Sequence, residues 1–493
     1  MQEGSPWLAE RIGKWVRKHS GVRIYPGSLL PGCPSSKGHK EHPPKRSYEW
    51  LARVLQRQSD LQFPSQRTSY LYSSCMMDCG LRRRAIFANA LLFGLLCSNC
   101  LSQQGAPPVT ALAQVISGLV YIQGEVNNST PLNVILDSGA SVSIVSPPLA
   151  ETLRLTSTHS SEASGIAKGL DQTVHFVDDC ELKWGSQASQ ISLLHQQSAI
   201  LPIDYIAEQV GKRVDAIFGS NLFLHYTITV DYEQQRVTFT SPVSGAPILG
   251  TAIPVQVLSN TPFVEASIEG EDGKKVTALF LVDSGTTGAM ILNKKFLESH
   301  PGLIAQTHFV DTPTVTAVGG AIHSKRVRVP HVGLGPFLFS GVVAAVPEAS
   351  SGALSNATVA GFIGAGILKR FTVTWDYTGK RMVLLPNRTL SEPFETDASG
   401  LHLVSPGPQY QIVTIDSVLP GSPAAQAGLE PGDEILAVDE VSGLPLWKVS
   451  EALRKAGTSV VLTVQRKATI LKITQPLSTD KLKRERWITT YGS

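Results

Sequence analysis

The sequence predicts a mainly β protein in which two similar lobes precede a small α+β domain. Short apolar runs rich in Val, Ile and Thr are separated by frequent Gly and Pro, which is typical of strands and turns. These runs recur as a long-period duplication, which indicates two similar lobes and not a solenoid of small units. The chain changes character near residue 395, and its 493 residues allow about three domains.

The N-terminal region differs from the rest of the chain in charge and cysteine content. Residues 1–84 carry 15 Lys and Arg against 6 Asp and Glu, whereas the remaining chain carries 28 basic and 34 acidic residues. A mildly acidic body argues against nucleic acid as a partner. Five of the 6 Cys lie in the first hundred residues, so Cys180 has no partner for a disulfide within the body.

A secretory signal peptide or membrane anchor is predicted over residues 81–107. Three arginines at 82–84 precede the apolar stretch 85–96, and small and polar residues follow it. The stretch is short for a transmembrane helix, although an anchor is an alternative to a cleaved signal. We therefore expect export, to a periplasmic or an extracytoplasmic membrane-anchored location.

The position of this signal predicts where translation begins. Signals normally open a chain, and Met76 and Met77 stand just before this one. We expect translation to start at one of these two residues. Residues 1–75 are then sequence upstream of the natural start; otherwise the region 1–80 is a disordered extension.

We predict no metal and no cofactor. Cys75 and Cys79, and likewise Cys97 and Cys100, have the spacing of metal-ligand pairs. The second pair borders the apolar segment and neither pair has supporting His residues, so a zinc site is disfavoured.

The strongest chemical signal is a turn that occurs twice. The apolar run 134–136 leads into Asp137, and the run 279–282 leads into Asp283. Each Asp opens an Asp-Ser-Gly turn at the end of a predicted buried strand, and the two copies are 146 residues apart. A single such turn is ordinary turn chemistry, but two matched copies predict a site of paired carboxylates.

A second repeated segment defines the two lobes. Residues 219–239 align with residues 364–384 without a gap, and both predict a short amphipathic helix, a strand, a turn at Asp-Tyr and a second strand. We place the first lobe at 108–245 and the second at 246–390. Their opening strands are expected over Ile116–Ile122 and Thr251–Ile268.

Each lobe also contains a glycine-bearing hairpin candidate. The first includes Gly165 and Gly169, and the second includes Gly319 and Gly320. Glycine permits the backbone angles that a mobile hairpin tip needs. An ordinary surface turn is the alternative at both places.

The repeated turns and the later apolar-apolar-Gly segments at 216–219 and 361–364 resemble those of the retropepsin-like aspartic proteases. The resemblance covers both lobes. It implies two homologous β-barrel lobes that form a pseudo-dimer, fused in one chain because both halves carry the turn. It also implies that the two glycine hairpins are flaps.

The resemblance further assigns roles to the turn residues. Asp137 and Asp283 are expected to form the catalytic dyad, and Ser138 and Ser284 to hydrogen-bond across the lobe interface. Gly139, Gly285 and Thr286 are expected to support the dyad, since the glycines allow close backbone approach. The family often has Thr where this chain has the two serines.

Paired carboxylates make hydrolytic chemistry possible on physical grounds alone. Two adjacent carboxylates cannot both ionise cheaply, so they share one proton. Aspartic proteases are a standard example of this splitting. The ionised member can then activate a water, and the protonated member can assist the carbonyl oxygen and the leaving nitrogen. Polypeptides are the expected substrates.

The segment 395–478 resembles bacterial PDZ domains. Gly421–Leu429 predicts a short helix packed through alanines, and 431–439 predicts a Pro-Gly-Asp turn and a buried strand. Gly400, Leu401, His402 and Leu403 stand where such domains bind a peptide, often through its terminal carboxylate. His402 replaces a usual Gly. A packing module without a ligand is the alternative.

The sequence therefore predicts an exported aspartic endopeptidase whose PDZ domain recruits or regulates peptides. A non-enzymatic peptide-binding scaffold with a degenerate protease fold is the rival interpretation. Residues 479–493 are expected to be a basic tail.

Overall fold

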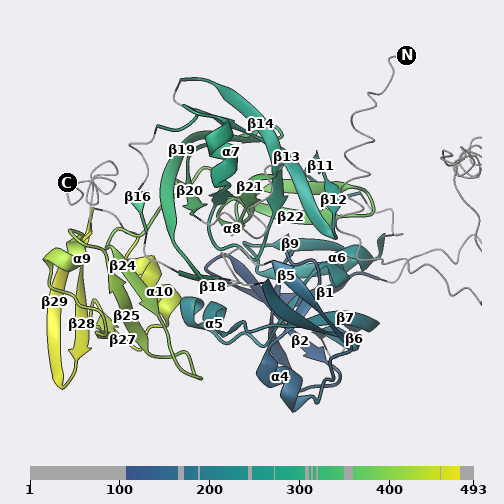
Figure 1. Cartoon of the computed structure of the whole chain (residues 1–493), viewed down its shortest axis with the longest axis horizontal. Helices are drawn as coiled ribbons and strands as arrows, with labels where there is room; N and C mark the ends of the chain where they lie inside the picture. Colours follow the sequence, from purple (N-terminus) through teal and green to yellow (C-terminus); the bar gives the residue numbers. More distant parts are fainter. Residues whose placement is uncertain are drawn as a thin grey trace, which may run out of the picture. The chain divides into compact units, whose positions relative to one another are not determined.

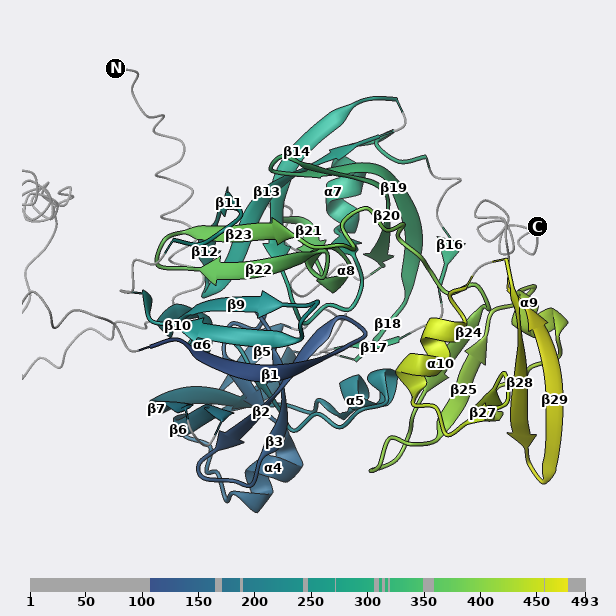
Figure 2. The ribbon, with the colours of Figure 1, turned by 180° about the vertical axis from the view of Figure 1, so that it is seen from behind.

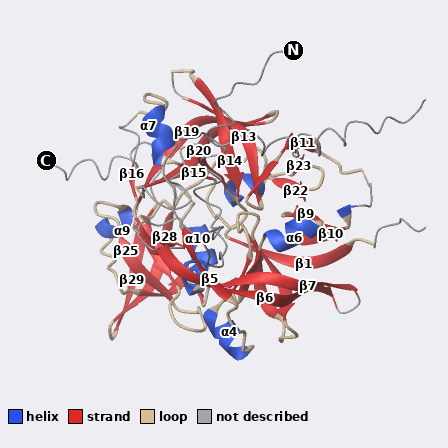
Figure 3. Ribbon diagram, turned by 45° about the vertical axis from the view of Figure 1, so that its right-hand side comes forward, coloured by secondary structure: helices blue, strands red, loops and turns tan. Residues whose placement is uncertain are grey.

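The computed structural model describes residues 107–164, 171–186, 189–242, 247–270, 272–305, 310–312, 315–317, 320–348, 359–455 and 457–477. The predicted extension 1–80, residues 81–106 of the predicted signal and the basic tail lie outside these described residues. Strands dominate the described chain (Figure 3), and its helices are short. No helix among the described residues has the length and apolarity needed to cross a membrane.

The first lobe is a closed β-barrel. Its strands follow the order β2-β3-β8-β4-β7-β6, and pairing between β2 and β6 closes the ring. Their bounds are Leu119–Val126 (β2), Leu132–Leu136 (β3), Ser143–Val145 (β4), Asp171–Ser186 (β6), Ser189–Ile200 (β7) and Ala216–Phe218 (β8). Strand β5 (His159–Ser164) extends from β6 as a hairpin. The interior is lined by fully buried side chains such as Trp184 and Phe218.

The second lobe repeats this arrangement. The order is β13-β14-β21-β15-β20-β19, closed by pairing between β13 and β19. The bounds are Thr261–Glu269 (β13), Lys275–Val282 (β14), Met290–Leu292 (β15), Ser324–Leu334 (β19), Phe337–Pro347 (β20) and Val359–Ile363 (β21). Strand β12 (Gln256–Leu258) pairs with β13, and β16 (Val310–Asp311) pairs with β19. A separate hairpin joins β17 (Val315–Ala317) to β18 (Gly320–Ile322).

A sheet built from both lobes joins the two barrels (Figure 2). The first lobe supplies β1 (Val109–Ile116), β9 (Thr227–Asp231) and β10 (Arg236–Thr240), and the second supplies β11 (Thr251–Pro254), β22 (Phe371–Asp376) and β23 (Arg381–Pro386). Strands β9 and β22 meet antiparallel, so that Thr229 faces its own repeat partner Thr374 with hydroxyls 2.8 Å apart. The duplicated segments therefore pair with each other at the pseudo-twofold axis.

Strands open both lobes as expected, but turns divide the expected segments. Ser117 and Gly118 have positive φ angles of 52° and 90° and form a turn that divides the first segment into β1 and β2. The second segment divides at the Ser259-Asn260 turn, where φ is again positive at both residues. Small and Asn residues adopt this left-handed conformation at low cost, which the apolar pattern alone did not reveal.

Short helices connect the strands. They are α4 (Pro147–Thr152), α5 (Asp204–Val210), α6 (Ser220–His225), α7 (Lys294–Ser299) and α8 (Ala365–Leu368). Helices α6 and α8 directly follow the apolar-apolar-Gly segments, as the duplicated sequence predicts. One hydrophobic core runs through both lobes, and Phe223 of α6 packs against Trp375 of β22 with ring centroids 5.7 Å apart.

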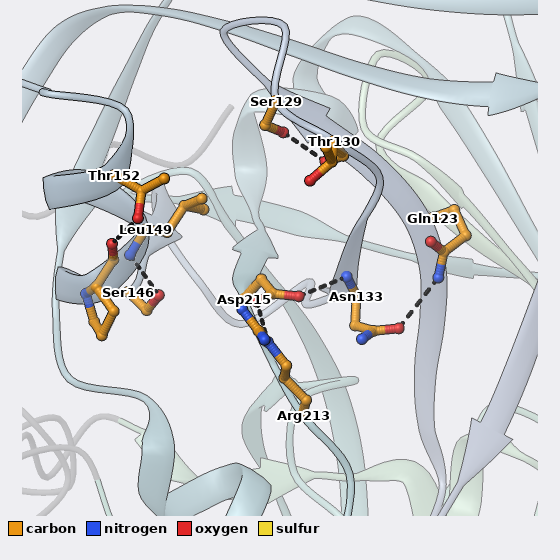
Figure 4. Close-up of polar contacts among 10 residues, drawn as sticks. Gln123, Ser129, Thr130, Asn133, Ser146, Leu149, Thr152, Arg213 and Asp215 are labelled. Carbon is orange, nitrogen blue, oxygen red and sulfur yellow. Dashed lines mark hydrogen bonds and ion pairs between the residues drawn. The ribbon is translucent and has the colours of Figure 1, made fainter. Parts of the chain in front are cut away.

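A buried carboxylate fixes the start of the strand that carries the first acid turn. Asp215 precedes β8 and is 6% exposed. Its side chain accepts hydrogen bonds from the Asn133 backbone N–H at 2.9 Å and from Arg213 Nε at 2.6 Å (Figure 4). Its carbonyl oxygen accepts from the Ser146 N–H at 3.1 Å. These contacts set β3 and β8 in register beside each other.

The C-terminal domain is a small α+β unit with its own core (Figure 1). Its sheet follows the order β24-β25-β26-β28-β29, with β27 on β26. The bounds are Leu401–Val404 (β24), Val413–Val418 (β25), Glu434–Val438 (β26), Val441–Ser442 (β27), Ser459–Arg466 (β28) and Thr469–Pro476 (β29), with helices Pro423–Gln426 (α9) and Leu446–Ala452 (α10). The mainly β class with two barrels and a terminal α+β domain is thus confirmed.

Candidate active site

The two acid turns occupy equivalent places in the two barrels. Asp137 follows β3, and its N–H donates to the Phe218 carbonyl oxygen at 3.0 Å. Asp283 follows β14, and its N–H donates to the Ile363 carbonyl oxygen at 2.9 Å. In each lobe the acid strand runs parallel to the strand of the apolar-apolar-Gly segment. That segment therefore holds the turn from beneath, a role that the sequence alone did not assign to it.

Reciprocal hydrogen bonds between two buried serines lock the turns together. The Ser138 N–H donates to Ser284 Oγ at 2.9 Å, and the Ser284 N–H donates to Ser138 Oγ at 3.1 Å. Each hydroxyl then donates across the interface to a carbonyl oxygen, Ser138 to Val282 at 2.8 Å and Ser284 to Leu136 at 3.1 Å. Four bonds between separate lobes leave the turns little freedom to move apart.

Each turn glycine lies directly against the acid of the other lobe. A Cβ atom on Gly139 would stand 2.6 Å from Asp283 Cγ, and one on Gly285 would stand 2.4 Å from Asp137 Oδ2. No side chain fits at such distances. Glycine is therefore required here by close approach, and it lets the carboxyl groups meet.

The two carboxyl groups lie close enough for each to affect the pKa of the other. Burial, followed by the charge of Asp283, holds the pKa of Asp137 well above its usual range. Burial also raises the pKa of Asp283, although hydrogen bonds from Thr286 and Asp137 to that carboxylate oppose the rise. Asp283 is 8% exposed and Asp137 is partly exposed. The pair is arranged to hold one proton, and Asp137 is the favoured carrier.

One difference between the turns explains this preference. Each acid accepts a bond from the glycine two residues on, at 2.8 Å in both lobes. Thr286 Oγ1 additionally donates to Asp283 Oδ2 at 2.8 Å. The first lobe has Ala140 at the matching position, which has no hydroxyl to give Asp137. Hydrogen bonds to the charged form favour ionisation, so Asp283 ionises more readily than Asp137 although the two turns are repeats of each other.

The hairpin candidates are described only in part. Strands β5 and β6 pair up to Ser164 and Asp171, and the tip with Gly165 and Gly169 lies outside the described residues. Strands β17 and β18 pair through Ala317 and Gly320, whereas Gly319 lies outside the described residues. Both lobes thus carry a hairpin where one was predicted, and the flap role stays a prediction.

Two tyrosines near the dyad were not singled out from the sequence. Tyr205 of α5 is half-buried, and its pKa is raised by burial and by the charges of both acids. Tyr377 is buried, its hydroxyl lies 3.5 Å from the Ser138 carbonyl oxygen, and burial and Asp137 raise its pKa. The repeated Asp-Tyr pair was a signal for Tyr377. The sequence offered none for Tyr205.

The predicted peptide-binding loop of the PDZ domain is occupied by its own side chains. The Asp397 carboxylate accepts from the Ser399 N–H at 3.2 Å and the Gly400 N–H at 2.6 Å. Ser399 Oγ accepts from the Leu401 N–H at 3.0 Å. Gly400 has a φ of +82°, which suits glycine in this tight turn.

The remaining predicted groove residues lie on β24, at the edge of the sheet. Leu401 and Leu403 are buried in the domain core. His402 points elsewhere, with Nδ1 3.0 Å from Asp416 Oδ2. Whether these residues bind a peptide stays a prediction.

No group of His, Cys, Asp or Glu suited to a metal ion occurs within the described parts of the chain. The Cys75–Cys79 and Cys97–Cys100 pairs lie outside those parts. Cys180 is buried as a free thiol.

Comparison with protein families supports both resemblances. Residues 122–222 match the family model described as aspartyl protease, and residues 414–466 match the PDZ domain model. Together with the two barrels, this confirms the similarity to retropepsin-like aspartic proteases, followed by a PDZ domain. The first match contains the Asp137 turn.

Individual relatives cover smaller parts of the chain. DNA damage-inducible protein 1 of Phaeosphaeria nodorum is 26% identical over 162 residues, which is 32% of this chain and 33% of that protein. This chain thus spans about a third of the length of the curated relative that it matches. Among solved structures, the photosystem II D1 C-terminal processing protease is 26% identical over 17% of this chain and 23% of its own, with a TM-score of 0.16. The HtrA3 PDZ domain bound to a phage-derived ligand is 20% identical over 16% of this chain and 81% of its own, with a TM-score of 0.15.

The serine lock generates a stability prediction. Ser138→Ala and Ser284→Ala should each lower the free energy of unfolding by about 1–3 kcal/mol, because each leaves a buried N–H and a buried C=O unsatisfied. Denaturant unfolding followed by far-UV circular dichroism measures this. Each substitution removes a different pair of the four serine bonds, and because the two serines are in contact, the departure of the double variant from the sum of the single losses measures their coupling.

Threonine substitutions provide the matched control, because Ser138→Thr and Ser284→Thr keep the hydroxyl. Alanine variants as stable as the parent would show that the lock contributes nothing to the lobe interface.

Proposed function

We propose that this chain is an aspartic endopeptidase that hydrolyses peptide bonds with a water activated by Asp137 and Asp283. One observation carries the proposal: two carboxyl groups from separate lobes each lie against the turn glycine of the other lobe, on turns that four serine bonds lock in place. Such a rigid pair that shares a proton is suited to general acid–base catalysis. The match of residues 122–222 to the aspartyl protease family supports the same chemistry.

The proposed reaction assigns a separate role to each acid. Ionised Asp283 takes a proton from the water as its oxygen attacks the peptide carbonyl carbon, and Asp137 gives its proton to the carbonyl oxygen. The resulting diol collapses as Asp283 passes its proton to the leaving nitrogen and the C–N bond breaks. Asp137 recovers a proton from a diol hydroxyl, so the dyad returns to its starting state.

The unequal turns favour this direction of proton flow. Thr286 stabilises the charged form of Asp283, whereas Ala140 offers no hydroxyl to Asp137. The pKa of Asp137 is raised more strongly than that of Asp283. Asp137 therefore holds the proton that the substrate carbonyl oxygen receives. No covalent intermediate is required.

We also propose that the PDZ domain recruits or regulates peptide substrates. Its edge strand β24 offers one unpaired side in the sheet order, which is the geometry for adding a peptide as a further strand. The rival, a scaffold that binds peptides without cleaving them, makes the opposite prediction in the dyad experiment below.

The dyad should determine both activity and the pH dependence of stability. Asp137→Asn and Asp283→Asn should each lower kcat on a mixed peptide substrate by at least about 10³-fold. Asp137→Asn should also reduce the dependence of the free energy of unfolding on pH. The folded chain keeps a proton that the unfolded chain releases above about pH 4, so stability falls as pH rises from there toward the raised pKa of Asp137, by at most about 1.4 kcal/mol per pH unit.

Unfolding at several pH values and peptide cleavage assays measure the two effects. Asp179→Asn, at an exposed carboxylate, is the control for both. Cleavage that survives both dyad substitutions would eliminate the mechanism, and firm peptide binding without any cleavage by the parent would favour the scaffold.

The unequal turns predict opposite shifts in the pH–rate profile. Thr286→Val removes a donor to ionised Asp283, so the acidic limb of kcat/KM should move to higher pH. Ala140→Ser offers a donor to Asp137, so the alkaline limb should move to lower pH. Each shift should be about one pH unit, the equivalent of one hydrogen bond to a charged group.

The control for this pair is Thr287→Val, at the exposed neighbouring position. Unchanged limbs in both variants would mean that the hydroxyl at this position does not decide which acid carries the proton.

Export of the protein stays a proposal that rests on the charge and apolarity of residues 82–96. We expect N-terminal sequencing of the protein from its native membrane or exported fraction to begin after this stretch, or at Met76 or Met77 if the stretch anchors the chain. Peptides from residues 1–60 in the native protein would contradict the predicted start.

A further inference from the structure

Helix α5 of the first lobe contacts the PDZ domain at one end of its predicted peptide groove. The Glu208 carbonyl oxygen accepts a hydrogen bond from the Ser405 N–H at 2.7 Å. Ser405 directly follows β24, the strand to which a peptide would add. Figures 1 and 2 both draw α5 beside α10, which by the resemblance to PDZ domains would form the other wall of that groove.

The contact with α10 is close and apolar. Gly211 ends α5 with a φ of +73°, and a Cβ at this position would lie 2.6 Å from Leu446 Cβ. Trp447 of α10 and Tyr410 of the PDZ domain pack against the first-lobe cluster that includes Ala207 and Val210 of α5. Backbone and side chains of α5 therefore meet both walls of the groove.

This contact uses a backbone donor that a bound peptide would need. Strand β24 pairs with β25 on one side, and N–H groups along a strand point alternately to its two sides. The N–H of Ser405 points to Glu208 and so continues the free edge. A peptide added as a strand forms its bonds along this edge, and its backbone would compete with α5 for Ser405.

The other end of the groove is also occupied by the chain itself. The amides of Ser399, Gly400 and Leu401 donate to the side chains of Asp397 and Ser399. The Asp397 carboxylate stands where a terminal carboxylate would have to be held. The loop therefore favours an extended internal segment of a peptide over a free C-terminus.

The same hydrophobic cluster extends from α5 to the proposed active site. The cluster under α5 contains Ile135 of the strand that ends at Asp137, and Ala140 of the acid turn packs against it. Helix α5 also contacts β17 of the second-lobe hairpin. One short helix thus adjoins the PDZ groove, the Asp137 turn and a flap candidate.

The linker before the PDZ domain is held to the second lobe. The Arg370 guanidinium donates to the carbonyl oxygens of Thr389, Leu390, Glu392 and Pro393, and it stacks 3.8 Å from the Phe394 ring centroid. Movement of the PDZ domain away from α5 must then occur in the few residues between Phe394 and Ala398. Release would leave the domain close to the lobes.

We propose that α5 is an internal ligand of the PDZ groove, and that an extended peptide entering the groove displaces α5 and thereby changes the peptidase site. The claim that α5 is an internal ligand rests on the contacts described above. The claim that its displacement changes the peptidase site rests on the proposed endopeptidase function, because it concerns the effect on cleavage.

The test uses the full chain and a fluorescent pentapeptide mixture with apolar residues, prepared with free and with amidated C-termini. Tyr410→Ala/Trp447→Ala removes the two PDZ rings that pack on the α5 cluster, and Ile412→Ala, at an exposed site, is the control. Binding and hydrogen exchange are measured with Asp137→Asn/Asp283→Asn also present, so neither depends on catalysis.

We expect the ring-deleted protein to bind the mixture at least tenfold more tightly than the parent, with faster exchange of the Gly211 and Ser405 amides. Amidated and free peptides should bind alike. With the dyad restored, the ring deletions and saturating peptide should change kcat/KM in the same direction, each at least threefold.

The Asp137→Asn/Asp283→Asn chain with Tyr410 and Trp447 intact provides a second test that does not depend on the ring deletions. Saturating peptide must speed exchange at Gly211, and continued protection there in the bound state would overturn the proposal. Equal affinity in the parent and ring-deleted proteins, or no binding by either, would overturn it as well. Displacement without any cleavage would leave α5 as the internal ligand and reject the endopeptidase.

Discussion

The reciprocal bonds between Ser138 and Ser284 are the interaction on which the candidate site depends. Two carboxyl groups repel each other when both ionise, and burial makes each charge more costly. They stay together only if rigid backbone holds them there. The serines provide this with four hydrogen bonds that cross between lobes, and Gly139 and Gly285 remove the side chains that would keep the acids apart.

Fusion of two lobes in one chain lets the halves of a symmetric site diverge. A homodimer must place the same residue on both turns, whereas this chain places Ala140 on one and Thr286 on the other. The hydroxyl supports ionisation of Asp283 and leaves the proton with Asp137. The pseudo-twofold frame is nonetheless retained, since Thr229 and Thr374 still pair across the axis.

Helix α5 is a further difference between the two lobes, because this first-lobe helix contacts the PDZ domain. It packs in the cluster that includes Ile135 and adjoins Ala140 of the acid turn, and it also contacts both walls of the predicted PDZ groove. Because Arg370 holds the linker to the second lobe, the PDZ domain remains near this helix. The proposed peptide binding and the proposed peptide cleavage would thus share one structural element, which would couple the PDZ domain to the peptidase site.

The sequence by itself determined the two lobes, the terminal α+β domain and the two candidate acids, because duplication preserves strand periodicity and turn chemistry that can be compared within one chain. The resemblance to retropepsin-like aspartic proteases also anticipated that the serines would bond across the interface. Only the tertiary structure decided which acid keeps the proton, since that depends on burial and on the hydroxyl of Thr286. It alone brought Tyr205 to the dyad and Glu208 to Ser405, because contacts between residues far apart in the chain leave no local pattern.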